Sequence, residues 1–134
     1  MSYPISIVLF SGTDDKLHAA ATIVAGAAAL DRPVNVLLQF WALDAFRADH
    51  AGVGRGLAFE ALRPGQQPPA KPGALPWAET FRQAKELGEV RIRACSASMA
   101  YLDLEPAQLD PMVDDVCGIA AFLLDADTGP VVFI

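Results

Sequence analysis

The sequence predicts one α/β domain built on a parallel sheet of about five strands, with helices on both faces. Three observations lead to this fold class. The chain has five short strand-like segments, helix-like segments separate them, and 134 residues suit a single core. Apolar runs rich in β-branched residues are typical of parallel strands that are buried on both faces. The expected strands are 5–10, 34–40, 90–94, 112–116 and 131–134.

The segments between these runs carry helical signals. The first is rich in Ala and apolar almost all round, with Thr13 as a candidate N-cap, so we expect it to be covered on more than one side. A later segment places Trp77 and Phe81 on one face, opposite charged residues, and Gly88 follows as a candidate C-terminal cap. Helices are expected over 14–30, 41–48, 77–87, 97–102 and 118–126.

The stretch 49–76 differs from the rest in composition. It holds five of the ten glycines and five of the ten prolines and shows no apolar period. We therefore predict a Pro/Gly-rich loop without an extended regular element, either mobile or ordered by a partner. It is too short to be a second domain, so residues 1–134 form one unit. Its Gly52-Val53-Gly54-Arg55-Gly56 run lacks the spacing of a nucleotide-binding motif and is interpreted as loop glycines.

The charge balance excludes several classes of partner. A net charge of −6 and a pI near 4.7 argue against nucleic acid and against anionic membrane surfaces. The longest uncharged apolar stretch, 17–30, is shorter than the roughly 20 residues that a spanning helix needs. We expect no signal peptide, and two cysteines do not make a secreted disulfide framework. The predicted compartment is the cytoplasm.

A functional site is expected at the carboxyl edge of the sheet, because ligands of parallel sheets bind outside the carboxyl ends of the strands. Trp41, at the end of the second strand, is either core or a wall of this site. The residues at the predicted strand ends include Gly12, Thr13, Trp41, Cys95, Ser96 and Cys117.

Cys95 is the strongest candidate for chemistry, because it falls where a strand passes into a helix. The helix N-terminus there favours an anion by about 0.3–1 kcal/mol. Strand alternation places Arg91, Arg93 and Cys95 on one face, and guanidiniums beside a thiol further favour the reactive thiolate. The alternative is a small buried hydrophobe. Cys117 has the same two interpretations, as a neighbour of Cys95 in a redox or relay pair, or as a packing residue.

Other chemistries fit less well. A thiol peroxidase needs Thr or Ser three residues before its cysteine, where this chain has Ile92 and Asp114, and there is no C-x-x-C pair. His18 and His50 are far apart and neither has a second ligand close by, so we predict no metal and no cofactor. Two acidic residues in the turn after the first strand would repel a phosphate. Nucleotide or flavin binding is therefore the third-ranked hypothesis.

Several segments, in this order and spacing, resemble the DsrE/DsrF-like sulfur-relay family. The resemblance covers most of the chain outside 49–76. Asp103 and Ala42 depart from it, because they stand where the family commonly has glycine. The matching segments are Gly12-Thr13-Asp14 with Lys16, Phe40-Trp41 with Leu43, 88–92 leading to Cys95, Cys95-Ser96-Ala97-Ser98-Met99 with Leu104, and Gly118-Ile119-Ala120.

The resemblance implies a flavodoxin-like sheet, a homo-oligomer of three or more subunits, and a Cys95 that carries a persulfide. We therefore predict an intracellular persulfide carrier or sulfurtransferase-like protein, with a sulfur donor or acceptor protein as a further partner. The alternative is a non-catalytic, oligomeric small-ligand or protein-binding domain of the same fold, in which Cys95 is inert. The predicted site has Cys95 as its catalytic residue and Gly12, Thr13, Trp41, Arg93, Ser96 and Ser98 as binding residues.

Overall fold

The computed structural model describes residues 3–58 and 75–134. Its five strands are all parallel and lie in the order β4-β3-β2-β1-β5, so the predicted α/β fold class is confirmed. Of the predicted loop, 49–58 contains no helix or strand, and 59–74 lies outside the described residues. The strands are β1 (Ile5–Leu9), β2 (Val34–Leu38), β3 (Val90–Cys95), β4 (Asp115–Cys117) and β5 (Val131–Phe133).

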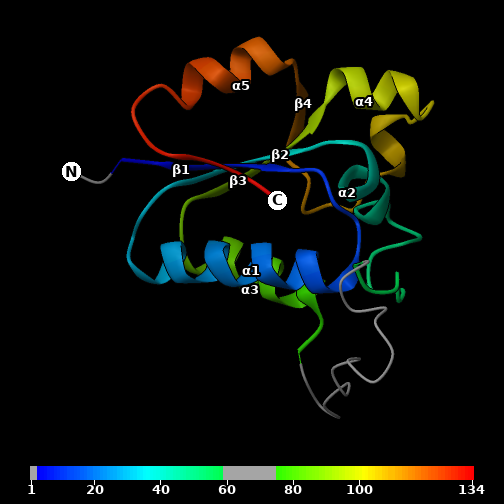
Figure 1. Cartoon of the computed structure of the whole chain (residues 1–134), viewed down its shortest axis with the longest axis horizontal. Coiled ribbons are helices and arrows are strands. Elements are labelled where there is room, and N and C mark those ends of the chain that lie inside the picture. Colours follow the sequence, from blue (N-terminus) through cyan, green and yellow to red (C-terminus); the bar gives the residue numbers. More distant parts are fainter. Residues whose placement is uncertain (1–2, 59–74) are drawn as a thin grey trace.

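Helices cover both faces of the sheet, but unequally (Figure 1). The two long helices, α1 and α3, lie side by side on one face, and α5 lies alone on the other. The short helices α2 and α4 stand at the carboxyl edge of the sheet. None of the helices in the described ranges is long and apolar enough to cross a membrane. The helices are α1 (Asp14–Ala29), α2 (Phe40–Ala45), α3 (Trp77–Leu87), α4 (Ser96–Tyr101), the 3-10 helix η2 (Pro106–Gln108) and α5 (Ile119–Asp125).

The two faces of the sheet carry two separate apolar clusters, because successive side chains of a strand point to opposite sides. Ile7, Val36 and Ile92 belong to the main core beneath α1 and α3. Their neighbours in sequence point the other way. Val8, Leu37, Cys95 and Phe122 form a second, smaller cluster, against which Cys117 packs. This second cluster lies between the sheet and α5, and it contains the predicted site cysteine.

The fourth strand begins later than the sequence predicted. The expected strand 112–116 is replaced by a turn followed by β4 at 115–117. Asp110 causes the shift, because its carboxylate accepts the N–H of Met112 at 3.0 Å and its carbonyl accepts the N–H of Val113 at 2.9 Å. The later start makes Cys117 the last residue of the strand itself.

Gly88 ends α3, although not as a left-handed cap. Its backbone is extended, with φ −144 and ψ −172. A Cβ at this position would lie 2.9 Å from the Cβ of Ala28 and 3.0 Å from its Cα. Glycine is therefore required by the close packing of the end of α3 against α1.

Candidate functional site

Cys95 occupies the junction that the sequence predicted. It is the last residue of β3 and the N-cap residue of α4. The side chain is buried, with 3% of its surface exposed, and it packs with Val8, Leu37 and Phe122. The thiol therefore lies beneath α5, at the carboxyl edge of the sheet.

Cys117 is the direct neighbour of Cys95 across the sheet. The two residues are Cα partners in the parallel pairing of β3 with β4, and both are free thiols. Cys117 is half-buried. Burial raises the pKa of the Cys117 thiol above its ordinary value, while the positive charge of Arg93 acts in the opposite direction. The structure thus brings together two thiols that are 22 positions apart in the chain.

Arg93 lies on the same face of β3 as Cys95 and is also buried, with 3% of its surface exposed. Its Nη2 is 2.9 Å from an Asp125 carboxylate oxygen on α5, and its Cζ stands 5.9 Å from the centre of the Phe122 ring. Within the described ranges, neither its Nε nor its Nη2 makes an aligned hydrogen bond. A buried guanidinium, paired with Asp125 and with an Nε that lacks a hydrogen bond in the described part of the chain, therefore lies on the face that holds the two thiols.

Arg91 does not take the role expected of it. It is half-exposed and its Nη2 donates to Asp115 at 3.0 Å, a residue of β4. The Asp115 carboxylate raises the pKa of Arg91, and burial, which lowers that pKa, is the smaller effect. Of the two arginines predicted beside the thiol, Arg93 alone is buried with it.

The two serines of the predicted site occupy different environments. Ser96 is exposed, and a Cβ built on Gly118 would lie 3.8 Å from its Oγ, so the hydroxyl stands between the ends of β3 and β4. Ser98 is buried and its Oγ has no hydrogen-bond partner in the described part of the chain. Among those residues, neither hydroxyl makes a hydrogen bond to Cys95.

Gly12, Thr13 and Trp41 form a second group, at the carboxyl ends of β1 and β2. A Cβ on Gly12 would collide with the carbonyl oxygen of Trp41, so only glycine fits there. Thr13 is the N-cap residue of α1, and its Oγ1 lies 3.3 Å from the Ser11 hydroxyl. The Trp41 side chain is 55% exposed, which makes it neither a core residue nor an enclosed wall.

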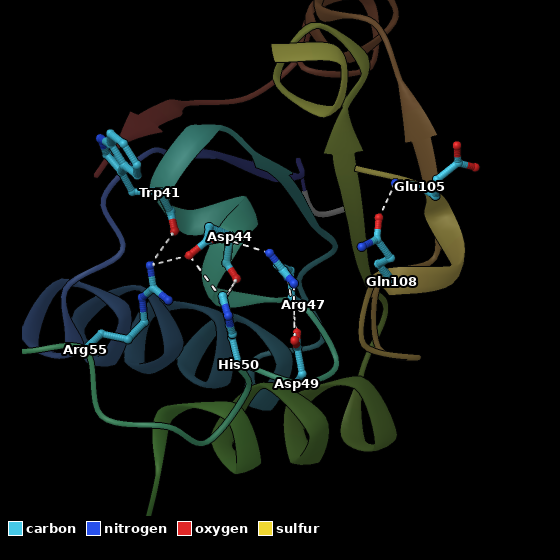
Figure 2. A network of polar contacts seen from close by, with 8 residues as sticks. All are labelled: Trp41, Asp44, Arg47, Asp49, His50, Arg55, Glu105 and Gln108. Atoms are coloured by element: carbon cyan, nitrogen blue, oxygen red, sulfur yellow. Dashed lines mark hydrogen bonds and ion pairs between the residues drawn. The ribbon is translucent and has the colours of Figure 1, made fainter. Parts of the chain in front are cut away.

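Arg55, which lies between Gly54 and Gly56 and was predicted to be only part of a loop, organises this second group (Figure 2). Its Nε donates to the Gly12 carbonyl at 2.7 Å and its Nη2 to an Asp44 carboxylate oxygen at 2.9 Å. Its backbone N–H donates to Asp14 at 2.9 Å. Figure 2 shows that Asp44 also faces Arg47 and His50, so this carboxylate is surrounded by basic side chains.

Several N–H groups of the turn after β1 are already hydrogen-bonded within the chain. The N–H groups of Phe10 and Ser11 donate to the Ile134 carbonyl at 2.7 and 3.1 Å, and that of Asp14 donates to Gly56 at 2.8 Å. The rings of Phe10 and Phe133 stack beside them, with centroids 5.8 Å apart. Nucleotide-binding turns instead leave such N–H groups free to bind the anion. The nucleotide and flavin hypotheses therefore find no support here.

The two groups of predicted site residues remain separate. They are linked indirectly by Phe40 of α2 and Tyr101 of α4, whose ring centroids are 5.1 Å apart. An open cleft of about 470 Å³ includes Arg82, Lys85 and Asp110 in its lining but neither thiol. Within 3–58 and 75–134, no group of three or more His, Cys, Asp or Glu side chains is placed to hold a metal.

These features define a small α/β domain with an open parallel sheet and a buried cysteine pair at its carboxyl edge. Two solved structures share its fold. MTH1491 of Methanobacterium thermoautotrophicum, a protein of unknown function, has a TM-score of 0.66 at 12% identity, with 99% of this chain and 100% of that chain covered. YchN of E. coli has a TM-score of 0.55 at 16% identity and full coverage of both chains. No family model matches the sequence.

A relative by sequence is YrkE of Bacillus subtilis (strain 168), an uncharacterized protein. It is 31% identical over 153 residues, which cover 94% of this chain and 92% of YrkE. The chain belongs to the same family as YrkE. The likeness to MTH1491 and YchN agrees with the flavodoxin-like sheet that the motifs implied, and it extends to the fold alone.

Proposed function

We propose that this protein carries sulfane sulfur on Cys95 as a persulfide and passes it from a donor to an acceptor thiol. One observation carries the proposal. Cys95 is buried at a strand-to-helix junction, on the same face as the buried Arg93 guanidinium, which pairs with Asp125 and whose Nε has no hydrogen-bond partner among the described residues. The ordered resemblance to the DsrE/DsrF-like proteins, from Gly12 to Gly118, supports the same chemistry.

The transfer consists of two displacements at sulfur. The Cys95 thiolate attacks the outer sulfur of a persulfide or polysulfide, the S–S bond of the donor breaks, and the donor leaves as a thiolate. Cys95 then carries a persulfide anion. An acceptor thiolate attacks the outer sulfur of that persulfide, and the Cys95 thiolate leaves. The two steps are redox-neutral overall, so they need no further oxidant or reductant.

The surroundings of Cys95 suit a charged sulfur species that must survive between these two steps. Burial beneath Phe122 keeps water and unrelated thiols away from the sulfur. Burying an anion is costly unless it is paired or hydrogen-bonded. Arg93, on the same face, pairs with Asp125 through Nη2 and keeps an Nε–H without a hydrogen-bond partner among the described residues. We assign Arg93 as a positioning residue that stabilises the persulfide anion.

Access to Cys95 runs along the carboxyl edge of the sheet. Small residues, Ser96 and Gly118, follow the two cysteines at this edge, and Ser96 is exposed. A donor approaching there meets a hydroxyl group and a glycine in place of bulky side chains. Phe122 is the side chain that has to move for a larger donor to reach the sulfur.

Intact-mass measurement after incubation with inorganic polysulfide tests the assignment. We expect Cys117→Ser to gain about 32 Da, one sulfur atom on Cys95, and Cys95→Ser to gain no adduct at its remaining cysteine. An adduct that persists in Cys95→Ser, or that never forms in Cys117→Ser, contradicts the assignment of Cys95 as the carrier. Circular dichroism of both variants controls for folding.

We also propose that the chain forms a homo-oligomer through α5 and β5. Within α5, every residue except Phe122 is exposed, although the sequence IAAFLLD is mostly apolar. Leu124 of α5 and Phe133 of β5 are 77% and 67% exposed. Large exposed apolar patches mark interaction sites, so these side chains are the candidate contact surface. A second copy of the chain would cover the sheet face that α5 leaves open.

Sedimentation of Leu124→Lys tests the oligomer, with Leu30→Lys as its matched control. Both leucines are 77% exposed, but Leu30 caps α1 on the opposite side of the sheet. We expect Leu124→Lys to lower the sedimenting mass and Leu30→Lys to leave it unchanged. A wild-type monomer at micromolar concentration contradicts the proposal. If the chain oligomerises while Cys95 takes no sulfur, the non-catalytic binding domain is the correct interpretation.

A further inference from the structure

The two thiols occupy matched positions on adjacent strands. The register of β3 with β4 pairs Arg93 with Asp115, Ala94 with Val116 and Cys95 with Cys117. Neighbouring strands lie about 4.8 Å apart, and disulfides join Cα atoms about 4.4–6.8 Å apart. Partners in a parallel ladder also point to the same face of the sheet. The backbone therefore places the two cysteines within the range that a disulfide requires.

The side chains share one environment as well as one register. Cys95 belongs to the small cluster under α5, and Cys117 packs against that same cluster. The guanidinium of Arg93, buried and without an aligned hydrogen bond in the described part of the chain, lies on this face too. The two thiols thus lie on the same face as a buried guanidinium that is paired with Asp125.

We propose that Cys117 is a resolving cysteine, which attacks the Cys95 persulfide and releases its outer sulfur as hydrogen sulfide. This inference rests on the persulfide proposed above. The Cys117 thiolate attacks Sγ of Cys95, the bond from that Sγ to the outer sulfur breaks, and the outer sulfur leaves as HS⁻. A Cys95–Cys117 disulfide forms. The sulfane sulfur is reduced to sulfide by the two cysteine sulfurs, so atoms and electrons balance.

The position of Cys117 lets the disulfide form and be undone. β4 has three residues and lies at the edge of the sheet, and Cys117 is the last of them, followed directly by Gly118. The end of an edge strand can shift toward its one neighbour without moving the rest of the sheet. A disulfide at the end of an edge strand is accessible to a dithiol reductant, which would return both thiols.

The charged groups around Cys117 set the direction of a pH effect. Burial raises the pKa of Cys117, Asp115 and Cys95 add to this, and Arg93 and Arg91 oppose it. Cys117 is consequently protonated at neutral pH to a greater extent than an ordinary thiol. The resolving step should therefore accelerate as the pH rises, whereas transfer to an external acceptor thiol does not depend on Cys117.

The test uses the full chain and inorganic polysulfide, with alkylation of free thiols before intact-mass analysis and with sulfide measured in parallel. We expect the wild type to become about 2 Da lighter than the reduced chain, with no alkylated cysteine, and to release about one sulfide per chain. Cys117→Ser and Cys117→Ala should instead retain the Cys95 adduct. The rate of sulfide release from the wild type should increase with pH.

Two outcomes separate failure of this inference from failure of the proposed function. If Cys117→Ser gains sulfur on Cys95 but the wild type retains the same adduct without a disulfide, the resolving role is wrong and the carrier role stands. If no adduct forms in Cys117→Ser, the carrier role fails, and the resolving role fails with it. Incubation with glutathione disulfide tests whether Cys95 and Cys117 can form a disulfide when no persulfide is present. The two cysteines are oxidised and glutathione disulfide is reduced to two glutathiones. Absence of the Cys95–Cys117 disulfide under this oxidant also overturns the inference.

Discussion

Replacing Phe122 by alanine should uncover Cys95. Phe122 is fully buried and is the one residue of α5 whose side chain enters the cluster beneath this helix. Its ring covers Cys95 and lies under the guanidinium carbon of Arg93 at 5.9 Å. The substitution therefore removes the main contact between α5 and the sheet and leaves the core under α1 and α3 intact.

The size of the effect follows from the buried ring. Truncation of a buried Phe to Ala costs about 3–5 kcal/mol, and loss of the cation–π contact adds about 0.5–2 kcal/mol. Because the cost falls on the docking of α5, it lowers the free energy of local opening. Even the lower end of the first contribution, about 3 kcal/mol, raises the population of the open state by at least about a hundredfold, since about 1.4 kcal/mol corresponds to a factor of ten.

The assay is the rate of alkylation of Cys95 by iodoacetamide under native conditions, followed by peptide mass mapping. Alkylation of a buried thiol tracks the open population when opening and closing are fast. We expect an acceleration of at least about a hundredfold in Phe122→Ala. Leu30→Ala, at a 77% exposed position, should stay within about 0.5 kcal/mol of wild type. An unchanged Cys95 rate in a folded Phe122→Ala protein refutes the argument that α5 controls access.

Three further predictions concern packing and ionisation. Gly88→Ala should lower the free energy of unfolding in urea by about 1–3 kcal/mol, because the new methyl group would lie 2.9 Å from a carbon of α1. Gly26→Ala is its control: a methyl group there meets nothing within 4 Å, so this variant should be slightly more stable than wild type. Burial raises the pKa of Asp15, but hydrogen bonds from a hydroxyl and from backbone N–H groups outweigh it and lower that pKa below 3.8. Asp15→Asn should therefore lose stability at neutral pH, and its difference from wild type should shrink as the pH falls below 3.8. Arg93→Met should raise the pKa of Cys117 further, which moves the pH profile of Cys117 alkylation to higher pH.

The fold was predictable because the strands and helices carry local signals that agree with one another. Runs rich in apolar and β-branched residues marked β1 and β2, the alternation of Val90 and Ile92 with arginine marked β3, and an amphipathic period marked α3. The start of β4 was not predictable. Its expected residues have strand propensity, but the Asp110 side chain and carbonyl capture the N–H groups of Met112 and Val113 in a turn. Contacts of this kind depend on a single side chain and leave little trace in the apolar pattern.

The candidate site was only partly predictable from the sequence. The position of Cys95 followed from the strand-to-helix transition, and the alternation of β3 placed Arg93 on its face. The pairing of Cys95 with Cys117 depends on the register between two strands, which a single sequence does not specify. Arg55 was missed because a loop residue shows no period, and its partners lie more than ten positions away.

The sulfur that Cys95 carries can be counted directly. Cyanide removes the outer sulfur of a persulfide as thiocyanate and leaves a thiolate, so thiocyanate released after polysulfide loading and desalting reports sulfane sulfur per chain. In Cys117→Ser, no second thiol can attack the Cys95 persulfide, so we expect about one thiocyanate per chain. The double variant with Cys95→Ser should release none. Equal amounts from the two variants, or none from either, would contradict the claim that Cys95 is a sulfur carrier.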